Sequence, residues 1–105
     1  MLVELKNTNE LQKYIDENEN VVVDFFATWC APCRALGSVM HELEGDYPNI
    51  TIVKVDVDKF MDLAMKYGVS SIPQVNIFKG GKEIGSFLGS RPSDEIRDLF
   101  DRLSK

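Results

Sequence analysis

The segment Val21-Val-Val-Asp-Phe-Phe-Ala-Thr-Trp-Cys-Ala-Pro-Cys33 joins a strand pattern to a helix pattern, with two cysteines at the junction. Its first part, Val21–Phe26, is an almost continuous run of β-branched and aromatic residues, which is typical of a central strand covered on both faces. After Trp29 the apolar residues recur at i, i+3, i+4 and i+7, which predicts a helix that begins near Ala31. The apolar stripe of this helix consists of Leu36, Val39, Met40 and Leu43.

Outside this segment the chain continues to alternate strand and helix patterns. Helix starts are predicted at Asn7 and Asp58, whose side chains can act as N-caps, and Pro92 suits a first helical turn. Gly68 is well placed to end the middle helix. Two strand patterns around Lys79-Gly-Gly-Lys82 predict a β-hairpin. Apart from Val21–Phe26, the predicted strands are Val3–Leu5, Ile50–Val57, Gln74–Phe78 and Glu83–Leu88.

This order of elements predicts an α/β fold, with a mixed sheet that has helices on both faces. Strands separated by helices should be parallel, whereas the terminal hairpin must pair antiparallel. With 105 residues the chain has room for one domain, which we expect to span residues 1–105. Because the central strand is buried on both faces, it offers no surface for self-association, and we expect a monomer.

The charge of the chain excludes two classes of partner. Its formal net charge is −5, and no run rich in lysine and arginine supplies the positive field that nucleic acids or anionic membranes require. No apolar run approaches the roughly 18 to 20 residues of a membrane span. The N-terminus lacks the basic region and apolar stretch of a secretory signal, so we expect a cytoplasmic protein.

The two cysteines lie three residues apart, and a disulfide between them would close too short a loop to serve stability. Their place at the start of a helix favours chemistry instead. Unpaired N–H groups and the positive end of the helix dipole favour a thiolate at Cys30, and the thiolate is the nucleophile in disulfide exchange. Cys33, one turn further in, should be less exposed and near enough to resolve a mixed disulfide. Pro32 is tolerated in the first turn, and Trp29 offers a flat apolar contact to a substrate.

Two other roles for the cysteine pair are a zinc site and a place in the core. A zinc site needs four ligands, and the only histidine, His41, lies beyond Cys33 on the same predicted helix, so only a site shared between two chains would suffice. His41 itself is expected to be a surface residue. The pair could also be two inert core cysteines. A redox role fits the position of the pair better than either.

Asp24 interrupts the most apolar strand of the chain, where a carboxylate is costly to desolvate. Burial should raise its pKa and make it a usable proton carrier for Cys33. Lys54 interrupts the neighbouring apolar strand in the same way and could tune Asp24. The alternatives are that Asp24 turns toward solvent or is simply neutralised by Lys54. A further anomaly is Ile72-Pro73, because Pro73 precedes a strand and could form a sharp turn if the bond is cis.

Taken together, these motifs resemble thioredoxin over essentially the whole chain. The residues that carry the resemblance are Val22-Val-Asp-Phe25, Trp29-Cys-Ala-Pro-Cys33, Val55-Asp-Val-Asp58, Tyr67-Gly-Val69, Ile72-Pro73, Phe78-Lys-Gly-Gly81 and Gly89. The resemblance implies a thioredoxin fold, a five-stranded mixed sheet flanked by four helices. It also implies a protein-disulfide reductase that receives its electrons from a separate thioredoxin reductase and binds no cofactor itself.

The resemblance also assigns roles to single residues. It implies that Cys30 attacks, that Cys33 resolves, and that Asp24 is the buried acid and base with Lys54 as its neighbour. The resemblance implies a cis-proline at Pro73, facing the dithiol. The residues that would bind substrate or tune the redox centre are Trp29, Ala31, Pro32, Ile72, Pro73 and Gly89.

Several positions depart from the family pattern. Ala31 stands where glycine is commoner, and Ser38 stands where a helix-kinking proline is usual. Gln74 follows the cis-proline where threonine is usual, Ser71 precedes it, and Phe26 replaces a second tryptophan. Two alternative functions stay open at this point. One is an oxidant or isomerase with the same residues at another potential, and the other is a binding module whose redox state only gates a contact.

Overall fold

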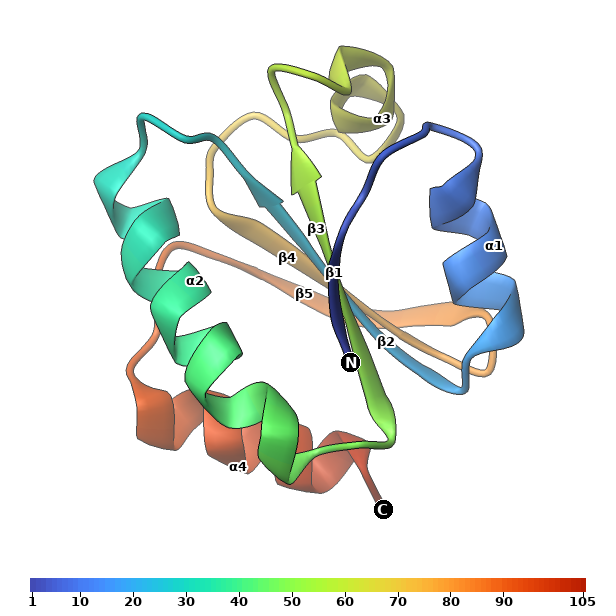
Figure 1. Cartoon of the computed structure of the whole chain (residues 1–105), viewed down its shortest axis with the longest axis vertical. Helices are drawn as coiled ribbons and strands as arrows, with labels where there is room; N and C mark the ends of the chain where they lie inside the picture. The colour runs from blue at the N-terminus through green and yellow to red at the C-terminus, as the bar shows by residue number, and fades with distance from the viewer.

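A five-stranded sheet with the strand order β1-β3-β2-β4-β5 forms the centre of the computed structural model, which describes residues 1–105 (Figure 1). The strands are β1 (Leu2–Glu4), β2 (Asn20–Phe26), β3 (Ile50–Asp56), β4 (Gln74–Lys79) and β5 (Lys82–Leu88). The helices are α1 (Glu10–Glu17), α2 (Ala31–Leu43), α3 (Met61–Lys66) and α4 (Ser93–Leu103), with a 3-10 turn at Glu44–Asp46. Strands β1, β3 and β2 run parallel, and β4 pairs antiparallel with β2 and β5. The predicted mixed sheet with four helices is confirmed.

Strand β2 lies in the middle of the sheet and every one of its residues is buried. Successive side chains of a strand point to opposite faces. Val22 therefore packs with α2 and α4 on one face, whereas Val21, Val23 and Phe25 pack with α1 and α3 on the other. Figure 1 shows the two layers of helices on opposite sides of the sheet. Asp24 and Phe26 share the parity of Val22, so they face α2.

Helix α1 begins later than Asn7. The side chain of Asn7 caps nothing; instead, the Glu10 carboxylate accepts hydrogen bonds from the N–H groups of Lys6 and Asn7 at 3.1 and 2.9 Å. The helix itself starts at Glu10. A carboxylate in the first turn of a helix can bind the N–H groups of the residues that precede the helix. A residue further upstream that could cap the helix is then not needed as the cap.

Helix α3 also starts later than its predicted cap. Asp58 precedes Met61, the first residue of the helix, and its carboxylate accepts a hydrogen bond from the indole N–H of Trp29 instead. The Asp58 side chain thus binds a donor from another loop and makes no capping hydrogen bond to α3. Gly68 follows the helix with φ +63°, which suits the predicted termination because glycine adopts this conformation without steric strain.

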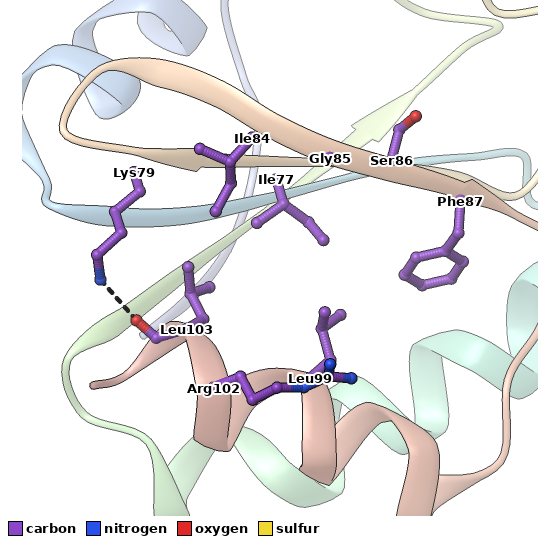
Figure 2. Close-up of a pocket in the computed structure, with 9 residues that line it drawn as sticks. All are labelled: Ile77, Lys79, Ile84, Gly85, Ser86, Phe87, Leu99, Arg102 and Leu103. Carbon is purple, nitrogen blue, oxygen red and sulfur yellow. Dashed lines mark hydrogen bonds between the residues drawn. The ribbon is translucent and has the colours of Figure 1, made fainter.

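Helix α4 packs against the face of the sheet that α2 also covers. It begins at Ser93, with Pro92 just before it rather than inside its first turn. At its other end Lys79 of β4 donates from Nζ to the Leu103 carbonyl at 2.7 Å (Figure 2). A cation suits the negative end of the helix dipole. None of the helices combines the length and the apolar character that crossing a membrane would need.

Candidate active site

Four strands begin or end at the same end of the sheet, which forms its loop edge. In the register of the sheet Phe26 lies opposite Asp56, Phe25 lies opposite Gln74, and Gln74 lies opposite Leu88. The loops that continue from β2, β3 and β5, and the loop that enters β4, must therefore lie close together. These loops carry the cysteines, Asp58, Pro73 and Gly89, so residues far apart in the sequence gather at this edge.

Cys30 is the N-cap of α2, as its place in the sequence predicts. The backbone N–H of Cys33 donates a hydrogen bond to Cys30 Sγ at 3.2 Å. The two cysteines are joined by a disulfide, with their Cα atoms 5.2 Å apart, and both are buried. When the bond is reduced, the same N–H and the helix dipole favour a thiolate at Cys30 over a thiol. Pro32 lies in the first turn, where its missing N–H removes no helical bond.

An apolar pocket of neighbours surrounds the disulfide. Phe26 and Ala27, at the end of β2, form one buried cluster with the two cysteines, and Ile72 packs against that cluster. These contacts exclude water from one side of the disulfide. His41 lies exposed on α2, and no group of three or more His, Cys, Asp or Glu side chains is placed to hold a metal ion.

The backbone of Pro73 is bound to the loop that follows β5. The Ile72-Pro73 peptide bond is cis, as the resemblance implies. The N–H of Gly89 donates to the Pro73 carbonyl at 2.8 Å, and Gly89 has φ +82°. A residue with a Cβ would be strained at this φ. Gly89 therefore lets the chain turn out of β5 and still bind the backbone of Pro73.

Asp24 is fully buried, and neither of its carboxylate oxygens has a hydrogen-bonding partner in the chain. Desolvation raises the pKa of this carboxyl from 3.8 to about 6, and the positive charge of Lys54 partly offsets that rise. The expectation of a raised pKa is confirmed, and the alternative that Asp24 turns toward solvent is wrong. A buried carboxyl that titrates near neutral pH can take up and release a proton under ordinary conditions.

Lys54 stands beside Asp24 in the register of β3 against β2, yet it forms no ion pair with it. Its ammonium group lies 4.3 Å from the centroid of the Phe26 ring. On the helix side, a Cβ added to Gly37 would come 3.3 Å from Lys54 Nζ, so the glycine leaves room for the ammonium. Lys54 thus acts on Asp24 as a nearby charge and leaves the buried carboxyl unneutralised by direct contact.

Trp29 is mostly exposed, but its orientation is restrained. Its indole N–H donates to Asp58 Oδ2 at 2.9 Å, and the backbone N–H of Asp58 in turn donates to Asp56 Oδ1 at 2.9 Å. This chain of contacts fixes one edge of the indole to the end of β3. The apolar face of the ring next to Cys30 is therefore presented in a defined position.

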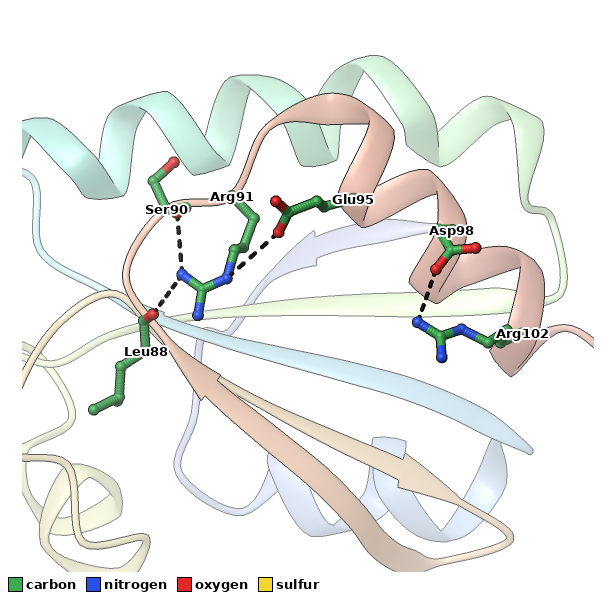
Figure 3. Close-up of polar contacts among 6 residues, drawn as sticks. All are labelled: Leu88, Ser90, Arg91, Glu95, Asp98 and Arg102. Atoms are coloured by element: carbon green, nitrogen blue, oxygen red, sulfur yellow. Dashed lines mark hydrogen bonds and ion pairs between the residues drawn. The ribbon is translucent and has the colours of Figure 1, made fainter.

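Arg91 is a residue at this edge that the sequence pattern did not single out (Figure 3). Its Nη1 donates to the carbonyls of Leu88 and Ser90 at 2.8 and 3.2 Å, and its Nε lies 3.7 Å from a carboxylate oxygen of Glu95. The two carbonyls flank Gly89, so the guanidinium braces the loop that binds Pro73. An arginine beside a proline carries no signal of such contacts, because they depend on how the loop closes.

We expect Arg91→Met to loosen this loop, because the variant keeps the apolar stem but loses the donors to both carbonyls. Allowing for the solvent screening of a partly exposed group, the free energy of unfolding should fall by about 1 kcal/mol. Amide hydrogen exchange at Gly89 should accelerate more than exchange in the core strands. Arg102→Met is the matched control, since Arg102 bonds only to Asp98 on the exposed face of α4 (Figure 3). Equal exchange at Gly89 in the two variants would contradict the bracing role.

The family model for thioredoxin matches residues 2–102. The chain belongs to the thioredoxin family. With a redox-active cysteine pair on this fold, it is a thiol-disulfide oxidoreductase that reduces protein disulfides.

Individual thioredoxins are similar to the chain over nearly their full length. The thioredoxin of Mycoplasmoides gallisepticum is 39% identical over 96 residues, which cover 91% of this chain and 96% of that protein. Thioredoxin-1 of Saccharomyces cerevisiae is 37% identical over 93 residues, covering 89% and 90%. Among solved structures, a mutant thioredoxin from Halobacterium salinarum superposes with a TM-score of 0.91 at 29% identity, covering 99% of this chain and 91% of the other.

Two departures from the thioredoxin pattern can now be placed. Gln74 is buried, and its side-chain amide donates to the Tyr67 carbonyl at 3.3 Å and to Asn76 Oδ1 at 2.9 Å. Its side chain therefore ties the end of α3 to β4. Ser38 is exposed, and α2 is a single helix from Ala31 to Leu43.

Proposed function

We propose that this chain carries electrons to protein disulfides in the cytoplasm, with Cys30 as the attacking thiol and Cys33 as the resolving thiol. The observation that carries the proposal is the disulfide at the N-terminus of α2, in which Cys30 Sγ accepts the N–H of Cys33. That hydrogen bond favours negative charge on Cys30 in the reduced state. Cys33 Sγ accepts no such hydrogen bond. The thiolate is therefore favoured at Cys30, as an attacking thiol requires, and less so at Cys33.

The proposed reaction has two exchange steps. The Cys30 thiolate attacks one sulfur of the target disulfide, an S–S bond to the target forms, and the other target sulfur leaves as a thiolate. Cys33 then loses its proton and attacks Cys30 Sγ, which forms the internal disulfide and releases the second target thiolate. The target gains two electrons and the chain loses two. The released thiolates take up protons.

Asp24 is the proposed proton carrier for Cys33, and Lys54 tunes it. Asp24 faces α2, the helix that carries Cys33, and burial raises its pKa to about 6. A carboxylate in this position can accept the proton that Cys33 must lose before it attacks. Lys54 lowers the pKa of Asp24 and so keeps the carboxylate form available near neutral pH.

The proposed electron source is a separate thioredoxin reductase, which would reduce the internal disulfide after each turnover; this chain would bind no cofactor. The similarity to thioredoxins over nearly the whole chain supports this partner. We also propose that the chain works as a monomer and binds neither nucleic acid nor membranes. Its most apolar strand, β2, is buried in the middle of the sheet, and its formal net charge is −5.

The reduction potential of the Cys30–Cys33 pair tests this direction of electron flow. Equilibration against a defined thiol buffer should give about −270 mV, the established value for thioredoxin. A potential near −180 to −120 mV, the range of oxidising folding catalysts, would instead favour an oxidant or isomerase. Failure to form the internal disulfide at all would leave only a binding module.

A further inference from the structure

A groove lies between β5 and α4 and shares no residue with the buried cluster around the cysteines (Figure 2). Its volume is about 410 Å³, which falls within the range of about 300–1,000 Å³ that small-molecule sites occupy. Its lining is mainly apolar and includes Ile77, Ile84, Phe87, Leu99 and Leu103. Ile84 is 58% exposed there, so a large apolar side chain stays in contact with water.

Gly85 leaves open space within the groove. It lies opposite Ile77 in the register of β5 against β4, and a bulge beside it leaves Ile84 without an opposite residue. A Cβ added to Gly85 would meet no atom within 4 Å, and the φ of Gly85 is not positive. Backbone strain therefore does not require glycine at this position. Glycine inside a strand weakens the strand, and one reason to find it there is the close approach of a ligand.

Three basic side chains gather at one end of this groove. Lys79 and Lys82 lie directly opposite each other in the β4–β5 hairpin, and like charges in such a pair are destabilising. Lys79 Nζ donates to the carbonyl of Leu103, so Arg102, the residue before it, lies at the same end. Both Lys79 and Arg102 line the groove, and no acidic residue does. The groove therefore has a positive end, although the formal net charge of the chain is −5.

The positive charge at this end is only weakly neutralised within the chain. Lys79 donates to main-chain oxygens and one amide oxygen, and neither Lys79 nor Lys82 forms an ion pair with an acidic side chain. Arg102 is bonded through Nη2 to Asp98, in an exposed ion pair of the kind that contributes about 1 kcal/mol or less. The neighbouring Glu83 instead accepts a hydrogen bond from Asn76, whose side chain lies on the other face of the sheet.

We propose that this groove binds a medium-chain fatty carboxylate, with its hydrocarbon chain over Gly85 and its carboxylate at Lys82 and Arg102. The hydrocarbon chain would cover apolar side chains that otherwise stay in water. The carboxylate would accept charge-assisted hydrogen bonds at the positive end. A short anion would leave the apolar walls uncovered, and an uncharged hydrocarbon would leave the basic side chains without a partner. Binding at this groove does not involve the cysteines and so does not depend on the proposed electron transfer.

Titration of the disulfide form with octanoate, followed by the amide chemical shifts of Ile84, Gly85 and Phe87, tests the proposal. Octanoate should bind about tenfold more tightly than octylammonium, which has the same chain and the opposite charge. It should exceed butyrate, which has the same charge and a shorter chain, by at least about tenfold. Equal affinity for octanoate and octylammonium, or shifts that are absent from these three residues, would overturn the proposal.

Two variants test the two parts of the site separately. Gly85→Leu should weaken octanoate binding about tenfold, because the new side chain fills the groove. Gly45→Leu is the matched control, since a Cβ there also meets no atom within 4 Å but Gly45 lies in the 3-10 turn, outside the groove. K82Q/R102Q should weaken octanoate binding about tenfold and leave octylammonium binding no weaker. Thermal unfolding checks that each variant is folded. Equal octanoate affinity in Gly85→Leu and Gly45→Leu, or unchanged affinity in K82Q/R102Q, would contradict the site.

Discussion

Cys30→Ser is expected to abolish the reduction of protein disulfides, with a loss of more than about a thousandfold in rate. A serine hydroxyl is not ionised at neutral pH and cannot form a disulfide, so the first exchange step has no nucleophile. The measurement is the rate at which a reduced thiol buffer, with the protein as catalyst, opens the disulfide of a peptide substrate. Thermal unfolding of the reduced proteins checks that the substitution leaves the fold intact.

Cys33→Ser is the matched variant, and its expected failure is different. Cys30 still attacks, but nothing resolves the product, so a mixed disulfide with the peptide should accumulate and be visible by mass spectrometry. The Cys30→Ser protein should form much less of this adduct. If Cys30→Ser were fully active on a protein target in a cell-free assay, the protein would not act as an enzyme on that target. The alternative of a binding module would then remain. Equal adduct formation in the two variants would contradict the assigned order of attack, and more adduct with Cys30→Ser would reverse it.

The central part of the fold could be predicted from local pattern alone. In β2 the run of valine and phenylalanine is buried on both faces, and in α2 the residues Leu36, Met40 and Leu43 face the core as their spacing requires. These elements are predictable because burial of apolar side chains dominates their energy, and burial leaves a periodic trace in the sequence. The junction between them fixes the position of Cys30 for the same reason.

The starts of the shorter helices could not be predicted to the residue. Asn7 and Asp58 are both good caps, yet Glu10 holds the entry to α1, and Trp29 takes the carboxylate of Asp58. Whether a side chain caps a helix depends on which hydrogen bond is more favourable for it in the folded chain. That competition contributes about 1 kcal/mol and depends on residues from other loops, so it leaves little trace in the local sequence.

Among the residues at the outer part of the site, some could be predicted from the sequence and others could not. Arg91 braces its loop through backbone carbonyls, which any sequence could provide. By contrast, the exposure of Met61 and Met65 follows from their spacing, because each lies two residues from the buried Leu63 and therefore on the other side of α3.

The second large effect is expected from Asp24, and it is an effect on how the free energy of unfolding depends on pH. The folded protein binds the Asp24 proton more tightly than the unfolded chain, because burial raises the pKa from 3.8 to about 6. The contribution of this group to stability is therefore full below pH 3.8 and is lost as the pH rises through about 6. A difference of about two pKa units corresponds to about 3 kcal/mol. The sign is opposite to that of an ordinary surface carboxylate in an ion pair.

Asp24→Asn should remove this loss. The stability difference between the variant and the wild-type disulfide form, measured by denaturant unfolding, should shift in favour of the variant by about 3 kcal/mol between pH 3 and pH 8. Taking the difference between the two proteins cancels the contributions of all the other titrating groups, because both proteins contain them. Lys54→Met should shift the wild-type transition to higher pH, because the charge that lowers the pKa of Asp24 is removed.

The same variants separate the proton carrier from a merely costly buried charge. If Asp24 takes the Cys33 proton, Asp24→Asn should slow the release of a preformed mixed disulfide and abolish the rise of that rate around pH 6. Lys54→Met should move the rise to higher pH by the same amount as it moves the stability transition, since one pKa governs both. A release rate with an unchanged pH profile in Asp24→Asn, together with the predicted change in stability, would mean that the carboxyl is buried at a cost without serving the exchange.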